Sequence, residues 1–296
     1  MPNFEKIEGT KANDIFASKD IDKDYKKGIV TALDILASGS HEQFFAFMMA
    51  AQTSFTNPNS ENSVTQQMAD GAFALLKFLN KEKDAPNGML ESVIFAAINQ
   101  YTIGDKKIFN FLKNVPGIKS TQTRDDGSAI ITLDSGKTIQ FSLLSQFLDD
   151  FANLKPEDKK ELESTKRIGK CHPGAALISQ ILLNELHQKC DVVSGRINFF
   201  DGKASIVHSW VEANLSPRRA SIIDYTMNVI MNKDGYELLN HIEELNRLSS
   251  TTIKDDYKSG MHEKIFKLGF GDGEYLLFRD EIVKDIEKLE DRNFEF

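Results

Sequence analysis

The chain has 296 residues, of which 41% are hydrophobic and 27% are charged, and this ordinary globular composition argues against a disordered chain. Its formal net charge of −8 argues against a primary role on nucleic acid, because phosphate binding needs clustered Lys and Arg. Two cysteines are too few for a disulfide framework, so we expect free thiols in a reducing compartment.

Residues 1–115 are predicted to form a helical N-terminal region. Apolar residues recur at steps of three and four in four segments, at 25–36, 41–53, 64–79 and 89–101. Turn-forming residues at 57–60 and 84–88 separate them. The second segment is rich in Phe and Met, and we expect its large apolar side chains to lie in the core: Phe44, Phe45, Phe47, Met48 and Met49.

The pattern changes near residue 115, and we predict a second domain over residues 116–296. Two short alternating runs flank Asp134-Ser135-Gly136, which indicates a β-hairpin over 129–141. Residues 173–188 are apolar nearly all round, so we expect a helix that is buried on several sides. Strands are predicted at 191–200, 204–215 and 220–227, and further helices at 143–152, from Pro156, at 235–248 and at 280–289.

Cys171 lies immediately before this buried helix. Pro173 suits the first turn of a helix, which places Cys171 at or just before the N-terminus. The helix dipole and free backbone N–H groups there stabilise a thiolate, and the same groups can hold a developing oxyanion. Cys171 is therefore our candidate nucleophile. Cys190, beyond the far end of the helix, is interpreted as structural.

His208 and Asp224 lie in neighbouring predicted strands. Residues of an antiparallel pair oppose each other at a constant sum of residue numbers, and a loop of odd length makes that sum even. With residues 216–218 as the loop, His208 opposes Thr226, and Asp224 becomes its diagonal neighbour on the same face. An ionised Asp224 would then orient the imidazole, as in a triad of nucleophile, base and orienting group.

Three segments together resemble the core of the transglutaminase-like (papain-type) superfamily. They are Gly-Lys-Cys-His-Pro-Gly-Ala-Ala from residue 169, His-Ser-Trp-Val-Glu from residue 208 and Ile-Ile-Asp-Tyr-Thr from residue 222. The order Cys, His, Asp matches that family, and the likeness covers residues 169–228, about a fifth of the chain. It departs from the family at Tyr225, where Pro is frequent, and at His172, where an aromatic residue commonly follows the cysteine.

The resemblance implies a Cys-bearing helix packed on an antiparallel sheet, and together with the helical region predicted over residues 1–115 this gives an α+β fold. Papain-like peptidases often use a Gln shortly before the cysteine for the oxyanion hole, and the nearest upstream one here is Gln146. His172 and Trp210 are the other candidates for substrate or oxyanion contacts. Should Asp224 not orient the imidazole, Asn228 and Glu212 are the next candidates.

The function implied is that of a thiol enzyme acting on a peptide or amide carbonyl through Cys171, His208 and Asp224, with a protein or peptide substrate and no cofactor. Hydrolysis by a peptidase or amidase is favoured, because water is the default acceptor. Glutamine deamidation and transglutaminase cross-linking are alternatives. A catalytically inactive binding module is the competing hypothesis. The sequence does not indicate the oligomeric state.

No metal site is expected. The acidic segment from Asp20 to Asp24 begins like a calcium loop, but Tyr25 and Thr31 replace the Gly and Glu that such a loop requires. The glycine-rich segment 269–273 lacks the Lys-Ser/Thr of a P-loop.

The two ends of the sequence bear on where the protein acts. The first residues hold no apolar run typical of a secretory signal, and no apolar stretch reaches the roughly 20 residues that cross a bilayer. We therefore expect a cytoplasmic protein with no membrane partner. Residues 287–296 are acidic and close on apolar residues, which resembles the C-terminal signals of effectors that some intracellular bacterial pathogens deliver through a type IV system. Export to a host cell by a non-Sec route is the alternative.

Overall fold

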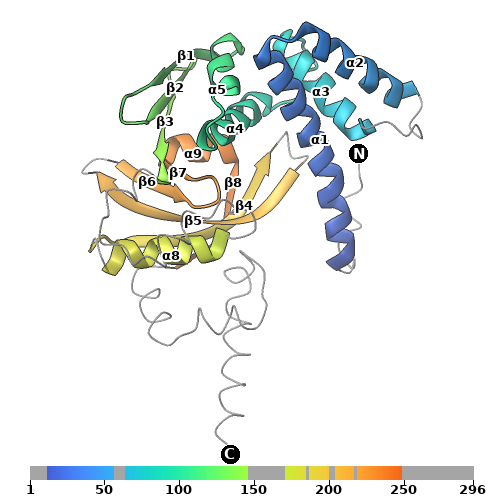
Figure 1. Ribbon diagram of the computed structural model, residues 1–296. Coiled ribbons are helices and arrows are strands. Elements are labelled where there is room, and N and C mark those ends of the chain that lie inside the picture. Colours follow the sequence, from blue (N-terminus) through green and yellow to red (C-terminus); the bar gives the residue numbers. More distant parts are fainter. Residues whose placement is uncertain are drawn as a thin grey trace, which may run out of the picture. The chain divides into compact units, whose positions relative to one another are not determined.

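In the computed structural model, the described residues are 12–56, 64–145, 171–184, 187–199, 204–216 and 219–248. They form an α+β fold of helices and one antiparallel sheet, with a helical N-terminal region (Figure 1). The chain divides into two compact units, Met1–Lys119 with Asn198–Ser205 and Ser120–Ile197 with Ile206–Phe296. The expected helices from Pro156 and at 280–289, most of the one at 143–152, Gln146 and the C-terminal tail lie outside the described residues.

The first unit contains the four predicted helices. They are α1 (Ala12–Ser38), α2 (His41–Thr56), α3 (Gln66–Leu79) and α4 (Met89–Thr102), followed by α5 (Lys107–Phe111) and the 3₁₀ turn η2 (Leu112–Asn114). Two glycines allow α1 and α3 to approach closely. A Cβ on Gly28 would lie 2.0 Å from the Met68 carbonyl oxygen, and one on Gly71 would lie 2.2 Å from that of Tyr25. A side chain at either position would push the helices apart.

The expectation that the Phe- and Met-rich face of α2 lies in the core is wrong in part. Phe47 is buried, but Phe45 is 67% exposed and Met49 is 48% exposed. These two residues are four apart and share one face of the helix, so one side of α2 packs and another does not. A helix that is apolar all round gives no sequence signal for which side is covered.

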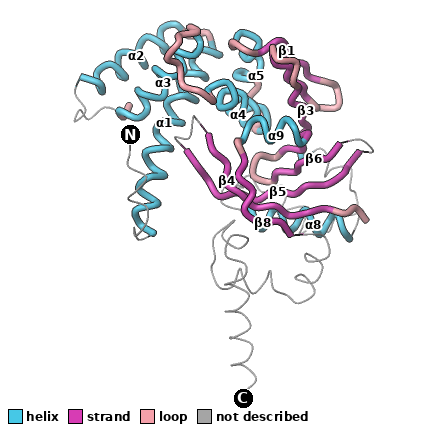
Figure 2. The backbone as a smooth tube through the Cα atoms, turned by 180° about the vertical axis from the view of Figure 1, so that it is seen from behind, coloured by secondary structure: helices cyan, strands magenta, loops and turns pink. Residues whose placement is uncertain are grey.

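The second unit is built on an eight-stranded sheet in the order β1-β2-β3-β7-β6-β5-β4-β8 (Figure 2). Its strands are β1 (Ile118–Thr123), β2 (Ala129–Leu133), β3 (Thr138–Leu143), β4 (Cys190–Phe199), β5 (Ala204–Ser216), β6 (Arg219–Asp224), β7 (Val229–Asn232) and β8 (Ile242–Leu248). The pairs β2–β3, β3–β7, β7–β6, β6–β5 and β4–β8 are antiparallel. The predicted hairpin and the three predicted strands after the buried helix are present.

Two helices cover opposite faces of this sheet, α8 (Cys171–Asn184) on one and α9 (Lys233–Asn240) on the other (Figure 1). The buried side chains of α8 recur every three or four residues and pack against odd-numbered positions of β5 and β6. That hydrophobic cluster contains Ala175, Ile178, Ile181, Leu182, Val211, Ala213 and Ile223. Because side chains alternate along a strand, even-numbered residues of β5 and β6 face the α9 side.

The predicted helix at 235–248 is correct only in its first half. Helix α9 ends at Asn240, where His241 adopts a left-handed conformation with a φ of 38°. The chain then continues as β8, which pairs with β4. The backbone groups of the β4 edge accept a strand there, and this tertiary pairing outweighs the local helical pattern. Strands β1 and β7 were not predicted.

Candidate active site

Helix α8 begins at Cys171, so the thiol stands at the helix start as predicted. Cys171 is 5% exposed, which is more buried than a helix start generally implies. The first turn of α8 approaches the Tyr225 ring closely, because Gly174 has no side chain. A Cβ at this position would lie 2.1 Å from the ring. Tyr225 follows β6 directly, and this close approach therefore holds the beginning of α8 at the end of β6, next to Asp224.

His208 and Asp224 form a buried pair across β5 and β6. His208 Nε2 donates to Asp224 Oδ2 at 2.7 Å, and the two side chains are 4% and 0% exposed. The pairs Val211–Ile223 and Glu212–Ile222 place Trp210 opposite Asp224 and leave His208 as its diagonal neighbour. This is the register predicted from the sequence.

The turn that produces this register is shorter than predicted. Ser216 pairs with Arg219, so the turn encloses two residues, which by itself would give an odd sum of residue numbers. The pairing shifts between Ala213 and Ser216, where β5 carries one residue more than β6. This β-bulge restores the even sum and returns His208 and Asp224 to one face.

The Cys171 thiol is close enough to His208 to contribute to the raised pKa of the imidazole. Because Nε2 of the imidazole is engaged with Asp224, Nδ1 is the nitrogen left for the thiol. The described residues therefore form a chain of neighbouring groups, sulfur, imidazole and carboxylate, of which the imidazole and the carboxylate are hydrogen-bonded. Such a chain can move a proton from the thiol to the imidazole while the carboxylate holds the ring orientation.

Asp224 accepts three hydrogen bonds and is fully buried. Besides His208, its Oδ2 accepts from the Tyr236 hydroxyl at 2.7 Å, and its Oδ1 accepts from the backbone N–H of Met227 at 2.9 Å. Burial would raise the pKa of Asp224, but the charge and hydrogen bond of His208, with the donors Met227 and Tyr236, lower it below its ordinary value. The carboxylate is therefore ionised.

The imidazole responds in the opposite direction. Burial would lower the pKa of His208, but the charge and hydrogen bond of Asp224, and then the neighbouring Cys171, raise it to about 10. The imidazole therefore keeps its proton to a higher pH than an ordinary histidine.

Trp210 lies two residues from His208 on the same face of β5, but it is buried and does not offer a surface to a substrate. Its ring stacks with the imidazole, with centroids 6.4 Å apart, and packs against Tyr236 at 5.7 Å. We therefore interpret Trp210 as a wall that holds the imidazole. His172 is the second residue of α8, and its side chain is outside the described part, as is Gln146.

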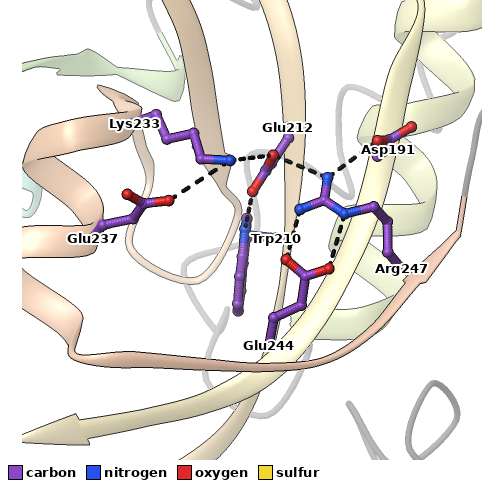
Figure 3. Close-up of polar contacts among 7 residues, drawn as sticks. All are labelled: Asp191, Trp210, Glu212, Lys233, Glu237, Glu244 and Arg247. Carbon is purple, nitrogen blue, oxygen red and sulfur yellow. Dashed lines mark hydrogen bonds and ion pairs between the residues drawn. The ribbon is translucent and has the colours of Figure 1, made fainter.

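An ion-pair network continues the same face of β5 beyond Trp210 (Figure 3). The Trp210 indole N–H makes a long, 3.5 Å hydrogen bond to Glu212, whose other oxygen accepts from Lys233 and Arg247, both at 3.0 Å. Arg247 also bonds Asp191 and Glu244. Burial would raise the pKa of Glu212, but the two cations lower it.

The network joins β4, β5, β8 and α9 around Trp210. The Glu212 carboxylate pairs with cations, and the Asn228 side chain accepts from the backbone N–H of Ser145, so each of these alternative orienting residues has another partner.

Cys190, the second cysteine, has the properties of a structural residue. It is buried at the start of β4, and its thiol donates to the Ser179 carbonyl oxygen at 3.7 Å. Burial, with the charge of Asp191, raises the pKa of Cys190 to about 12. A thiol held protonated in this way is a poor nucleophile.

Within the described ranges, no group of three or more His, Cys, Asp or Glu side chains is arranged to hold a metal ion. The helices of that same part of the chain include none long and apolar enough to cross a membrane. No protein-family model matches the chain, and neither a curated protein nor a solved structure matches it.

Proposed function

We propose that this chain is a cysteine-nucleophile enzyme that hydrolyses a peptide or amide bond, with Cys171, His208 and Asp224 as its triad in a transglutaminase-like (papain-type) core. One observation carries the proposal: the buried hydrogen bond from His208 to the ionised Asp224, which accepts three hydrogen bonds, with the Cys171 thiol beside the imidazole. The Cys-bearing helix packed on an antiparallel sheet, and the order Cys, His, Asp, support the choice of fold.

The geometry supports a two-step mechanism. His208 takes the thiol proton, and the Cys171 thiolate attacks the carbonyl carbon while backbone N–H groups at the start of α8 stabilise the oxyanion. The imidazolium then gives its proton to the leaving amine, which departs as a thioester forms. A water molecule, deprotonated by His208, attacks the thioester and releases the acid and the free thiol. Asp224 keeps the imidazole oriented through both steps.

The molecule that accepts the acyl group determines which reaction takes place. Water gives peptide hydrolysis or glutamine deamidation, and an amine gives cross-linking. A panel of peptides separates the three outcomes by mass spectrometry: chain cleavage, a gain of one mass unit at Gln, or incorporation of an added primary amine. We expect cleavage. Amine incorporation without cleavage would assign the chain to transglutaminase chemistry.

A catalytically inactive binding module is the second candidate, and the burial of Cys171 favours it, because a substrate carbonyl must reach the sulfur. The rate of Cys171 alkylation by iodoacetamide, followed against pH by peptide mapping, separates the two. If the chain is an enzyme, iodoacetamide should alkylate Cys171 at acidic pH, and this reactivity should be lost in His208→Gln. Cys190 is the internal unreactive control. Equal, slow alkylation of both cysteines would support the binding module.

A further inference from the structure

Tyr236 is a buried residue of α9 for which the triad alone leaves no role. It is 0% exposed, and its hydroxyl donates to Asp224 Oδ2 at 2.7 Å. The same oxygen accepts from His208 Nε2, also at 2.7 Å. The phenol and the imidazole therefore compete for the charge on one carboxylate oxygen.

Tyr236 is held in this place by its surroundings. Its ring packs on Trp210, which in turn stacks with His208, so that the three rings form a row that ends at the imidazole. Burial, followed by the charge of Asp224, raises the pKa of Tyr236 well above its ordinary value. The phenol is thus a permanent donor to Asp224 over the pH range in which the triad works.

We propose that Tyr236 is a positioning residue of the triad, which shares the Asp224 carboxylate with His208 and so sets how tightly the imidazolium holds its proton. The inference rests on the proposed function. With the phenol in place, its O–H group stabilises part of the negative charge on Oδ2. The imidazolium is then held less tightly by this charge and can release its proton to a leaving amine. Without it, His208 alone draws on Oδ2, and its proton is held more tightly.

The titration of His208 provides the test, because a residue that only fills space would not move it. In the described part of the chain, the titratable groups that face His208 or its partner are Cys171 on α8, Asp224 on β6 and Tyr236 on α9. Tyr236→Phe removes one hydroxyl and keeps the ring. Loss of a hydrogen bond to a charged group, with part of its energy felt at the imidazole, should raise the pKa of His208 by roughly 0.5–1 unit.

The measurement is NMR of the full chain labelled at histidine, with His208 assigned from the signal that His208→Gln removes. Tyr101→Phe is the matched control, since Tyr101 is a buried tyrosine of the other compact unit. We expect an upward shift in Tyr236→Phe and none in Tyr101→Phe. Peptide turnover should fall about tenfold in Tyr236→Phe alone, with its high-pH limb displaced in the same direction.

A second experiment covers the case in which Tyr236→Phe does not fold. Replacing all tyrosines by 3-fluorotyrosine makes each phenol a stronger donor and should lower the pKa of His208 in the wild-type chain. If that substitution leaves the titration of His208 unchanged, or if Tyr236→Phe folds and titrates like Tyr101→Phe, the inference is overturned. The proposed function fails by a different result, in which Cys171 is alkylated at the same rate in the wild-type chain, in His208→Gln and in Asp224→Asn.

Discussion

The substitution Asp224→Asn tests the candidate site most directly, because the amide keeps the volume of the carboxylate and changes only its charge and donors. Asp224 receives donors on both oxygens: His208 and Tyr236 on Oδ2 and the Met227 N–H on Oδ1. An amide has one acceptor oxygen and one NH₂ group. Neither orientation of the amide satisfies all three donors.

If the amide nitrogen replaces Oδ2, His208 must give up its Nε2 proton and carry it on Nδ1, where it cannot accept the proton of Cys171. If the nitrogen replaces Oδ1, it meets the Met227 N–H donor to donor. Either arrangement removes the charge that holds the imidazolium. We expect turnover to fall about 10²–10⁴-fold, as when a triad carboxylate is replaced by its amide, and the protein to lose roughly 1–3 kcal/mol of stability.

Alkylation of Cys171 measures the same effect without a known substrate. An unassisted cysteine, with a pKa of about 8.5, is about 0.3% thiolate at about pH 6. A thiolate paired with an imidazolium has up to roughly 300 times more reactive form, and its lower nucleophilicity reduces this advantage to roughly 20-fold. Nucleophilicity and access to the buried sulfur cancel in the ratio of the rates at about pH 6 and about pH 9 within one protein, so this ratio should fall by roughly 200-fold in Asp224→Asn, whereas the rate at about pH 6 alone should fall by roughly 20-fold. An unchanged ratio in a folded variant would refute the assignment of Asp224.

The other predictions concern the two cysteines, the start of α8 and the pH dependence of stability. Cys171→Ala should abolish turnover and cost about 1 kcal/mol, because one buried sulfur is lost, whereas Cys190→Ala should keep turnover; the reverse pattern would identify the other thiol as the nucleophile. Gly174→Ala should cost about 3 kcal/mol or more in urea titrations, since its Cβ would overlap the Tyr225 ring, and a neutral result would mean that the ring moves freely. Because the pKa of His208 is raised from 6.5 to about 10, its stabilising pair is complete below 6.5 and is lost as the pH rises to about 10. The free energy of unfolding should fall across that range, and His208→Gln should remove the slope.

The parts of the fold that the sequence could predict are those with a strong local signal. Four N-terminal helices, the hairpin over 129–141 and the Cys-bearing helix have clear periodicity or turn residues, and they are present. The spacing of Pro173 after Cys171 was enough to place the thiol at a helix start. Exposure of Phe45 and the strand β8 depend on what neighbouring elements cover or pair with, and no local pattern contains that information.

Tyr236 shows the same limit inside the candidate site. Its sequence neighbours form an ordinary amphipathic turn of helix, and nothing in their spacing points to Asp224, twelve residues earlier. Only the packing of α9 against the face of the sheet opposite α8 brings the phenol to the carboxylate. A buried tyrosine in a short helix after the predicted Asp strand is the one signal that was available, because such a hydroxyl needs a partner.

The pairing of His208 with Asp224 was predicted through the parity of the β5–β6 register, and its physical origin differs from the one expected. A turn of odd length, and a turn of even length combined with one bulge, both give an even sum of paired residue numbers. The sequence therefore predicted that His208 and Asp224 share a face, but not the length of the turn. The bulge between Ala213 and Ser216 has a further consequence, because it increases the local twist of β5 and bends the strand. It lies on the turn side of Glu212, which the cations of α9 and β8 hold in place. The segment of β5 that carries His208 and Trp210 is thus anchored at Glu212, before the irregularity, so that the bend of the strand falls between this anchor and the turn.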